Sequence, residues 1–177
     1  STLSSSSAAS DVYKRQELVD QSRRAATVFA GHGLTSGDRI ALMCYNTTGF
    51  VIAMLGAWRV GATIVPINHK LAPPEVAHII AHSGSSLLVV DGSLHAGTEG
   101  IDVAVMTTDT SVPDVPHLED ALASAAPLPA AEQAQLTDDT VAEILYTSGT
   151  TGLPKGCVHT HRTVTLTAMT AVIGLSM

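Results

Sequence analysis

The segment with the clearest chemical potential is residues 146–156, Tyr-Thr-Ser-Gly-Thr-Thr-Gly-Leu-Pro-Lys-Gly. Its three glycines let the backbone turn sharply and approach a ligand closely, and successive N–H groups in such a turn can converge on an anion. One cation, Lys155, ends the run, and Pro154 stiffens the backbone before it. Further hydrogen-bond donors are the hydroxyls of Thr147, Ser148, Thr150 and Thr151. The combination predicts a loop that holds phosphate.

This run differs from a Walker A loop, in which a glycine and four further residues precede Gly-Lys-Ser/Thr. Here Leu153 and Pro154 separate Gly152 from Lys155, and Gly156 follows the lysine. A solvated Ser/Thr/Gly linker is the plain alternative. It fits poorly, because the run lies between two apolar stretches and ends in Pro-Lys-Gly.

The same eleven residues resemble the signature loop of the AMP-forming adenylate enzymes, which include acyl-CoA synthetases, luciferases and the adenylation domains of peptide synthetases. The resemblance implies that the loop holds the β- and γ-phosphates of ATP, with Mg²⁺ bridging phosphate oxygens. It implies catalytic roles for Lys155 and Thr150, which would stabilise the departing pyrophosphate. The implied phosphate-binding residues are Thr147, Ser148, Gly149, Thr150, Thr151, Gly152 and Lys155.

Two other stretches extend the resemblance. Residues 61–68, Gly-Ala-Thr-Ile-Val-Pro-Ile-Asn, resemble a Gly-Ala-x-x-x-Pro-Leu-Asn segment of these enzymes. Residues 160–162, Thr-His-Arg, resemble what often follows the loop in acyl-CoA synthetases, and on that ground His161 joins the expected cofactor-binding set. A packing or helix-start role for His161 stays open at this point.

The resemblance implies a two-step reaction. A carboxylate attacks the α-phosphate of ATP to give an acyl-adenylate and pyrophosphate, and the thiolate of coenzyme A then displaces AMP. We therefore expect an acyl-CoA synthetase that acts on a fatty or aromatic acid, with ATP, Mg²⁺ and coenzyme A. The alternatives are an amino-acid adenylation domain of a peptide synthetase and a truncated, non-catalytic nucleotide-binding module.

The elements around the loop predict an α/β fold. Apolar runs that favour strands alternate with amphipathic runs that favour helices, and this order is typical of a doubly wound, largely parallel sheet flanked by helices. Ligands of such sheets lie beyond the carboxyl ends of the strands. In the second helix, Val51, Leu55 and Trp58 are expected to face inward. We expect strands at 39–44, 63–67, 86–91, 101–107, 141–145 and 157–159, and helices at 17–31, 47–61, 73–84, 117–126 and 160–177.

The chain divides into two parts at Gln16. Residues 1–16 are rich in Ser and Ala, lack an apolar period and resemble translated adapter sequence, so we expect a non-native or disordered leader. Residues 17–177 are expected to form a truncated N-terminal AMP-binding domain that is inactive alone. They contain no counterpart of the family's acyl pocket, ribose-binding acid, interdomain hinge or late catalytic lysine.

Composition narrows the classes of partner. The 177 residues are 45% hydrophobic, which is typical of a globular domain. A net charge of −7 and an aromatic content of 3% disfavour nucleic acid. No apolar run is long enough for a membrane helix, and two cysteines give no disulfide framework, so we expect a cytoplasmic protein.

The remaining histidines and cysteines are weaker candidates. His159 and His161 share one side if both lie on a strand, but no third ligand lies nearby in the sequence. His78 and His82 share a helix face, which we expect to be solvated. We expect no metal site. Cys44 and Cys157 are both expected to be small buried residues.

Overall fold

The computed structural model describes residues 4–147 and 153–175, and a six-stranded sheet in the order β4-β3-β1-β2-β5-β6 lies at its centre. Strands β1 to β5 run parallel, whereas β6 pairs antiparallel with β5 at the edge. The predicted largely parallel sheet is therefore confirmed. The strands are β1 (Arg39–Met43), β2 (Thr63–Pro66), β3 (Leu87–Asp91), β4 (Ala104–Thr108), β5 (Val141–Thr147) and β6 (Lys155–Thr160).

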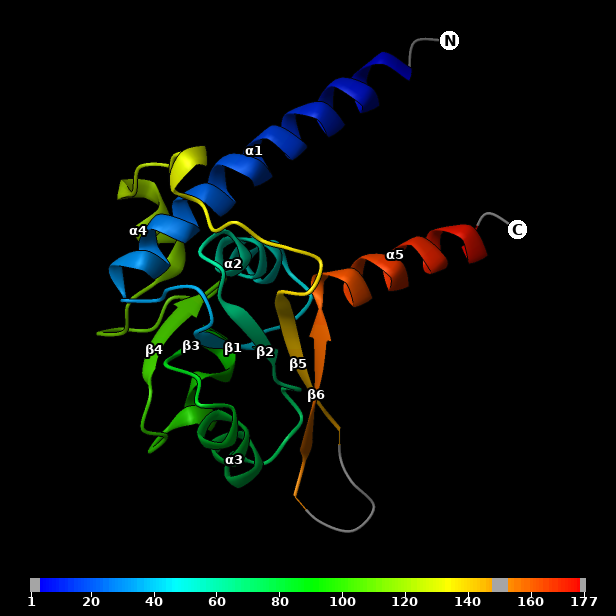
Figure 1. Ribbon diagram of the computed structural model, residues 1–177. Helices are drawn as coiled ribbons and strands as arrows, with labels where there is room; N and C mark the ends of the chain where they lie inside the picture. Colours follow the sequence, from blue (N-terminus) through cyan, green and yellow to red (C-terminus); the bar gives the residue numbers. More distant parts are fainter. Residues whose placement is uncertain (1–3, 148–152, 176–177) are drawn as a thin grey trace.

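Helices cover both faces of this sheet. Helices α1, α2 and α4 lie on one face and α3 lies on the other, as a doubly wound fold requires (Figure 1). The chain forms β2 beside β1 and then crosses to form β3 on the opposite side of β1. The helices are α1 (Ser4–Gly31), α2 (Thr48–Arg59), α3 (Pro73–Ser83), α4 (Leu118–Ser124) and α5 (His161–Leu175), with 3₁₀ turns η1 (Gly92–Thr98) and η2 (Ala130–Glu132).

Local chemistry explains where α2 and α3 begin and end. Thr47 caps α2, because its hydroxyl accepts a hydrogen bond from the Phe50 N–H at 3.3 Å. At the start of α3, the Glu75 carboxylate accepts a bond from the Ala72 N–H at 2.9 Å. Helix α3 then ends at Gly84, whose φ of 64° is left-handed and favours glycine.

The core has two halves, one on each face of the sheet. Successive residues of a strand point to opposite faces, so Ile40 and Leu42 pack toward α1 and α2. Ala41 and Met43 pack toward α3. Burial on both faces explains why β1 and β3 are continuous apolar runs rather than alternating ones.

The buried side of α2 differs from the prediction. Val51, Leu55 and Trp58 are only half-buried, and of the three Trp58 packs against the core, so the expected inner face is not the fully buried one. The face against α1 is made of small residues, since a Cβ on Gly56 would lie 2.5 Å from the Cβ of Ala25. The fully buried positions of α2 are Gly49, Ile52, Ala53, Gly56 and Ala57.

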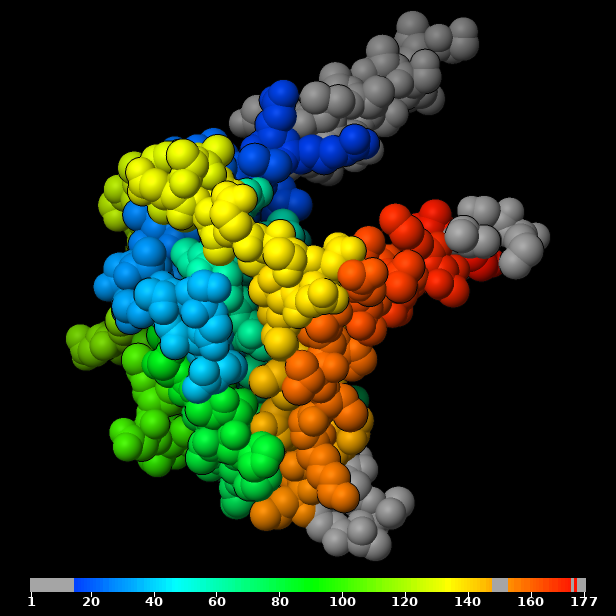
Figure 2. Space-filling view, in the orientation of Figure 1, coloured from blue at the N-terminus to red at the C-terminus, as the bar shows by residue number. Residues whose placement is uncertain are grey.

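The β5–β6 edge is less covered than the sequence predicts. Of the seven residues of β5, all of them described, Ala142 alone is fully buried. Helix α5 leaves the sheet soon after His161 and extends away from it (Figures 1 and 2). The apolar side chains of Val158, Leu166 and Met169 are exposed there. The expectation of a buried strand at 141–145 was therefore wrong for all but its second residue.

The first helix is longer than expected. Helix α1 begins at Ser4 rather than at Glu17, so most of the expected leader is helical backbone. The assignment of residues 1–16 as non-native stays a prediction. Among the residues that the structure describes, no helix is both long and apolar enough to cross a membrane.

Replacing Gly56 by Leu should lower the free energy of unfolding by about 2 kcal/mol or more, because the added side chain forces α1 and α2 apart. Urea denaturation of the purified chain measures this change. Gly31→Leu is the matched control, since a Cβ at Gly31 meets nothing within 4 Å. Equal stability of the two variants would contradict the close helix contact.

Candidate functional site

The predicted phosphate loop is closed by the pairing of β5 with β6. The antiparallel register places Thr147 opposite Lys155 and Tyr146 opposite Gly156. Thr147 and Lys155 are both exposed. The described part of the predicted site is therefore one hydroxyl and one ammonium, held on adjacent strands. Ser148, Gly149, Thr150, Thr151 and Gly152 lie outside the described residues, and their phosphate contacts stay predictions.

Thr147, from which the loop begins, lies at the edge of the sheet where the parallel strands end. Because β1, β2 and β5 run in the same direction, the residues that follow β1 and β2 lie at the same edge as Thr147. These residues include Asn46 and Asn68, whose amide side chains can donate and accept hydrogen bonds. The geometry agrees with the rule that ligands of such sheets bind at the carboxyl ends of strands.

A cavity of about 320 Å³ opens at these strand ends. Apolar side chains from β1, α2 and β5 form much of its wall, including those of Leu42, Phe50 and Leu145. Polar groups come from Asn46, Asn68, His69 and Tyr146. The cavity can accept a small organic group beside the loop. Of the four polar residues, Asn68 and Tyr146 lie in stretches that resemble known enzymes, whereas Asn46 and His69 carried no such signal in the sequence.

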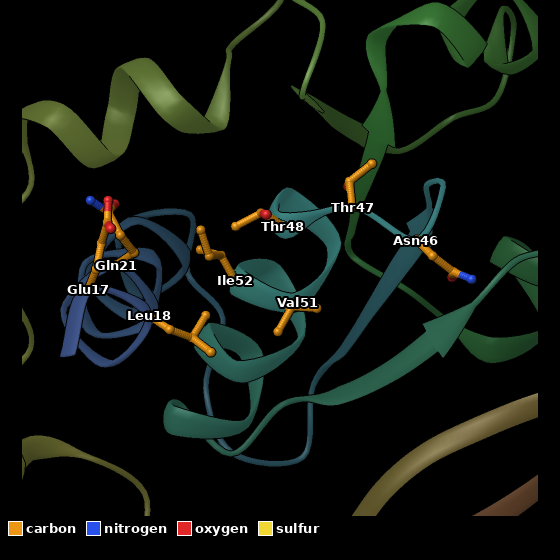
Figure 3. A pocket seen from close by; sticks show the side chains of 8 residues that line it. All are labelled: Glu17, Leu18, Gln21, Asn46, Thr47, Thr48, Val51 and Ile52. Carbon is orange, nitrogen blue, oxygen red and sulfur yellow. The ribbon is translucent and has the colours of Figure 1, made fainter. Parts of the chain in front are cut away.

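A second cavity, of about 580 Å³, lies between α1 and the first turns of α2 (Figure 3). Leu18, Val51 and Ile52 form its apolar wall, and Glu17 and Gln21 lie on α1. Asn46 lines both cavities. This side chain therefore borders both the space between the helices and the space at the strand ends.

Carboxylates on the β4 side of the same edge are already bound by donors. The Thr47 hydroxyl donates to Asp109 at 2.6 Å, and the Thr108 hydroxyl donates to Glu119 at 2.7 Å. Glu119 also accepts a bond from the Asp109 N–H at 3.0 Å. These negative groups repel an anion, whereas Lys155 attracts one. Electrostatics therefore favours phosphate binding at the β5–β6 side.

His161 lies at the other end of β6 from Lys155. Lys155 is the first residue of the six-residue strand and His161 follows its last, which corresponds to a separation of about 20 Å. The His161 ring meets Trp58 edge-on, with centroids 5.2 Å apart, and the Trp58 indole N–H donates to the Ala142 carbonyl at 2.9 Å. The structure thus places His161 in a packing and helix-start position and does not bring it to the loop.

The predictions for the remaining histidines and cysteines have different outcomes. His82 and His78 do share a face of α3, but His82 is bonded to Tyr146 and one nitrogen of His78 is buried, so that face is not simply solvated. Burial raises the pKa of the Cys44 thiol to about 12, which leaves it a poor nucleophile. Cys157 is exposed, contrary to prediction. Within residues 4–147 and 153–175 no group of three or more His, Cys, Asp or Glu side chains could hold a metal ion.

The family model of the AMP-binding enzymes matches residues 11–176. The chain belongs to this family. The match includes the strand-end edge and the described residues on both sides of the loop.

Three relatives illustrate the range of family members that the chain resembles. Long-chain-fatty-acid–CoA ligase FadD13 of Mycobacterium tuberculosis is 39% identical over 145 residues, 80% of this chain and 28% of the ligase. Crotonobetaine/carnitine–CoA ligase of Escherichia coli is 35% identical over 171 residues, covering 89% and 32%. O-succinylbenzoate coenzyme A synthetase (MenE) of Bacillus subtilis, solved in complex with AMP, has a TM-score of 0.75, 28% identity and coverage of 92% and 40%. The chain spans about a third of the length of the curated relatives it matches.

We predict that the nuclear magnetic resonance titration of His161 has its midpoint below 6.5. Partial burial lowers the pKa of this imidazole, because it disfavours the charged ring. The unfolded chain then binds the proton more readily, so His161 reduces stability as the pH falls through 6.5 and has no such effect well above it. Trp58→Ala uncovers the ring and should move the midpoint back toward 6.5. A wild-type midpoint at or above 6.5 would contradict the packing described.

Proposed function

We propose that this chain is part of an AMP-forming acid–thiol ligase, an acyl-CoA synthetase that activates a carboxylic acid with ATP. The observation that carries the proposal is the pairing of Thr147 with Lys155 in a chain of the AMP-binding family. This pairing holds a hydroxyl and a cation at the end of β5, where the family's phosphate loop is expected.

In the proposed first step the acid's carboxylate attacks the α-phosphate of ATP, and pyrophosphate leaves. Lys155 screens the charge on pyrophosphate, while Thr150 and the neighbouring loop residues donate hydrogen bonds to it. The chain's own contribution is thus to hold the leaving group in place rather than to form a covalent bond. In the second step the thiolate of coenzyme A attacks the acyl-adenylate, and AMP leaves.

Mg²⁺ fits this site as a partner of the phosphates. Among the described residues no group of three or more His, Cys, Asp or Glu side chains could hold a metal ion, and phosphate oxygens would supply ligands to Mg²⁺. When bound, the ion would neutralise phosphate charge. Lys155 provides the complementary charge from the protein side.

The stretch that this chain shares with its relatives is compatible with several acids. The three relatives are named for different acids: a long-chain fatty acid, crotonobetaine or carnitine, and O-succinylbenzoate. Each of these relatives nevertheless resembles this same chain. All three names also specify coenzyme A, which favours it over a carrier protein and disfavours the peptide-synthetase alternative. The cavity of about 320 Å³ beside Tyr146 supports binding of an organic group near the loop.

We further propose that residues 17–177 form the N-terminal part of an AMP-binding domain and do not turn over substrate alone. The coverage of about a third of each curated relative supports this. A cytoplasmic location is also proposed, and the two free cysteines, Cys44 and Cys157, support it.

Lys155→Ala and Thr150→Ala should each lower ATP–pyrophosphate exchange by about 10- to 100-fold, because each removes a donor to the leaving phosphates. Exchange is measured with a panel of carboxylic acids on a polypeptide of the relatives' full length that carries these residues. Thr165→Ala, an exposed threonine on α5, is the matched control and should exchange normally. Unchanged exchange in the Lys155 and Thr150 variants would refute the assigned roles.

A further inference from the structure

Tyr146, the last residue of β5 before Thr147, is bound by a side chain from α3. Its hydroxyl lies 2.7 Å from Nδ1 of His82, a residue 64 positions earlier in the chain. The two rings meet edge-to-face, with centroids 5.8 Å apart and an interplanar angle of 86°. This contact joins a helix on one face of the sheet directly to the strand that enters the phosphate loop.

The ring of Tyr146 also covers the start of β6. A Cβ on Gly156 would lie 3.2 Å from the Tyr146 ring and 2.7 Å from Cγ2 of Ile144. Gly156 lies opposite Tyr146 in the antiparallel register. The Tyr146 ring crosses the strand pair there and leaves little room for a side chain at position 156. The phenol thus touches both strands that border the loop, one residue before Thr147 and one residue after Lys155.

His82 is itself held in place by the end of α3. The Arg39 guanidinium, at the start of β1, donates to the carbonyls of Ser83 and Gly84, each at 2.9 Å. The His78 ring lies one helical turn away from the His82 ring, with centroids 5.4 Å apart. The helix end that carries His82 is therefore anchored to the sheet, and the imidazole is a fixed partner for the phenol.

We propose that His82 is a positioning residue, which holds Tyr146 so that Thr147 and Lys155 stand ready on both sides of the loop to receive a phosphate group. The proposal rests on the phosphate-binding function proposed above. His82 is exposed and adds little to the core, so its bond to Tyr146 acts on the loop's ends rather than on the fold. Burial raises the pKa of the Tyr146 phenol, which keeps the hydroxyl proton available for the bond at neutral pH.

Two measurements on the 177-residue chain test this role. The first is the ¹³Cζ chemical shift of Tyr146, which reports on the hydrogen bond of the phenol. The second is the affinity for pyrophosphate, measured by calorimetry. His82→Ala should change the shift and weaken pyrophosphate binding by about 3- to 10-fold, as expected for one lost hydrogen bond. Tyr146→Phe should weaken binding equally, and the double variant should lose no more than either single one.

His82→Gln tests rescue, because the glutamine amide can bond the phenol and should restore most of the affinity and the shift. His32→Ala removes an exposed histidine from the turn that follows α1 and should change neither measurement. Wild-type pyrophosphate binding that persists unchanged in His82→Ala would overturn the positioning role and leave the proposed function standing. A wild-type chain that binds no pyrophosphate, with the Tyr146 shift still sensitive to His82, would overturn the proposed function and with it the role assigned to the contact.

Discussion

The antiparallel pairing of β5 with β6 is the interaction on which the site depends. The other strand pairs are parallel, and parallel neighbours need long crossover connections, so they cannot place two consecutive segments of chain side by side at a strand end. The antiparallel pair β5–β6 does place two nearby segments of chain side by side at a strand end. It places Thr147 opposite Lys155, so that the two strand residues that border the predicted loop lie side by side at the edge where the parallel strands end.

The distribution of charge at that edge determines where a phosphate group is attracted. Asp91 accepts bonds from the N–H and the hydroxyl of Ser93, and Asp109 and Glu119 are bonded to neighbouring threonines. These carboxylates fix the connections that follow β3 and β4. In a chain with a net charge of −7, a phosphate group is attracted where a cation stands apart from such groups. Lys155 occupies that position.

Most of the scaffold could be predicted from the sequence because its signals are local. Continuous apolar runs marked β1 and β3 to within a residue or so, and Gly84 marked the end of α3. The inner face of α2 was misplaced because this helix is apolar nearly all round, so its period does not single out one face. Only the packed structure shows that small residues such as Gly56 face α1.

Features of the site that depend on distant residues could not be predicted. The bond between His82 and Tyr146 joins positions far apart in the chain, and the sequence alone placed His82 on a solvated face. His161 follows the loop closely in sequence, yet an extended strand carries it away from Lys155 to Trp58. The half-buried state of β5 likewise depends on α5 leaving the sheet.

The central claim is that the paired ends of β5 and β6 hold a phosphate group at the carboxyl edge of the sheet. The most direct test maps backbone amide shifts of the ¹⁵N-labelled chain as pyrophosphate is added. The account predicts the largest saturable shifts at Thr147, Lys155 and the loop between them, with their loss in Lys155→Ala. Shifts that centre on α1 and the cavity beside it, or on the amino ends of the strands, would contradict it.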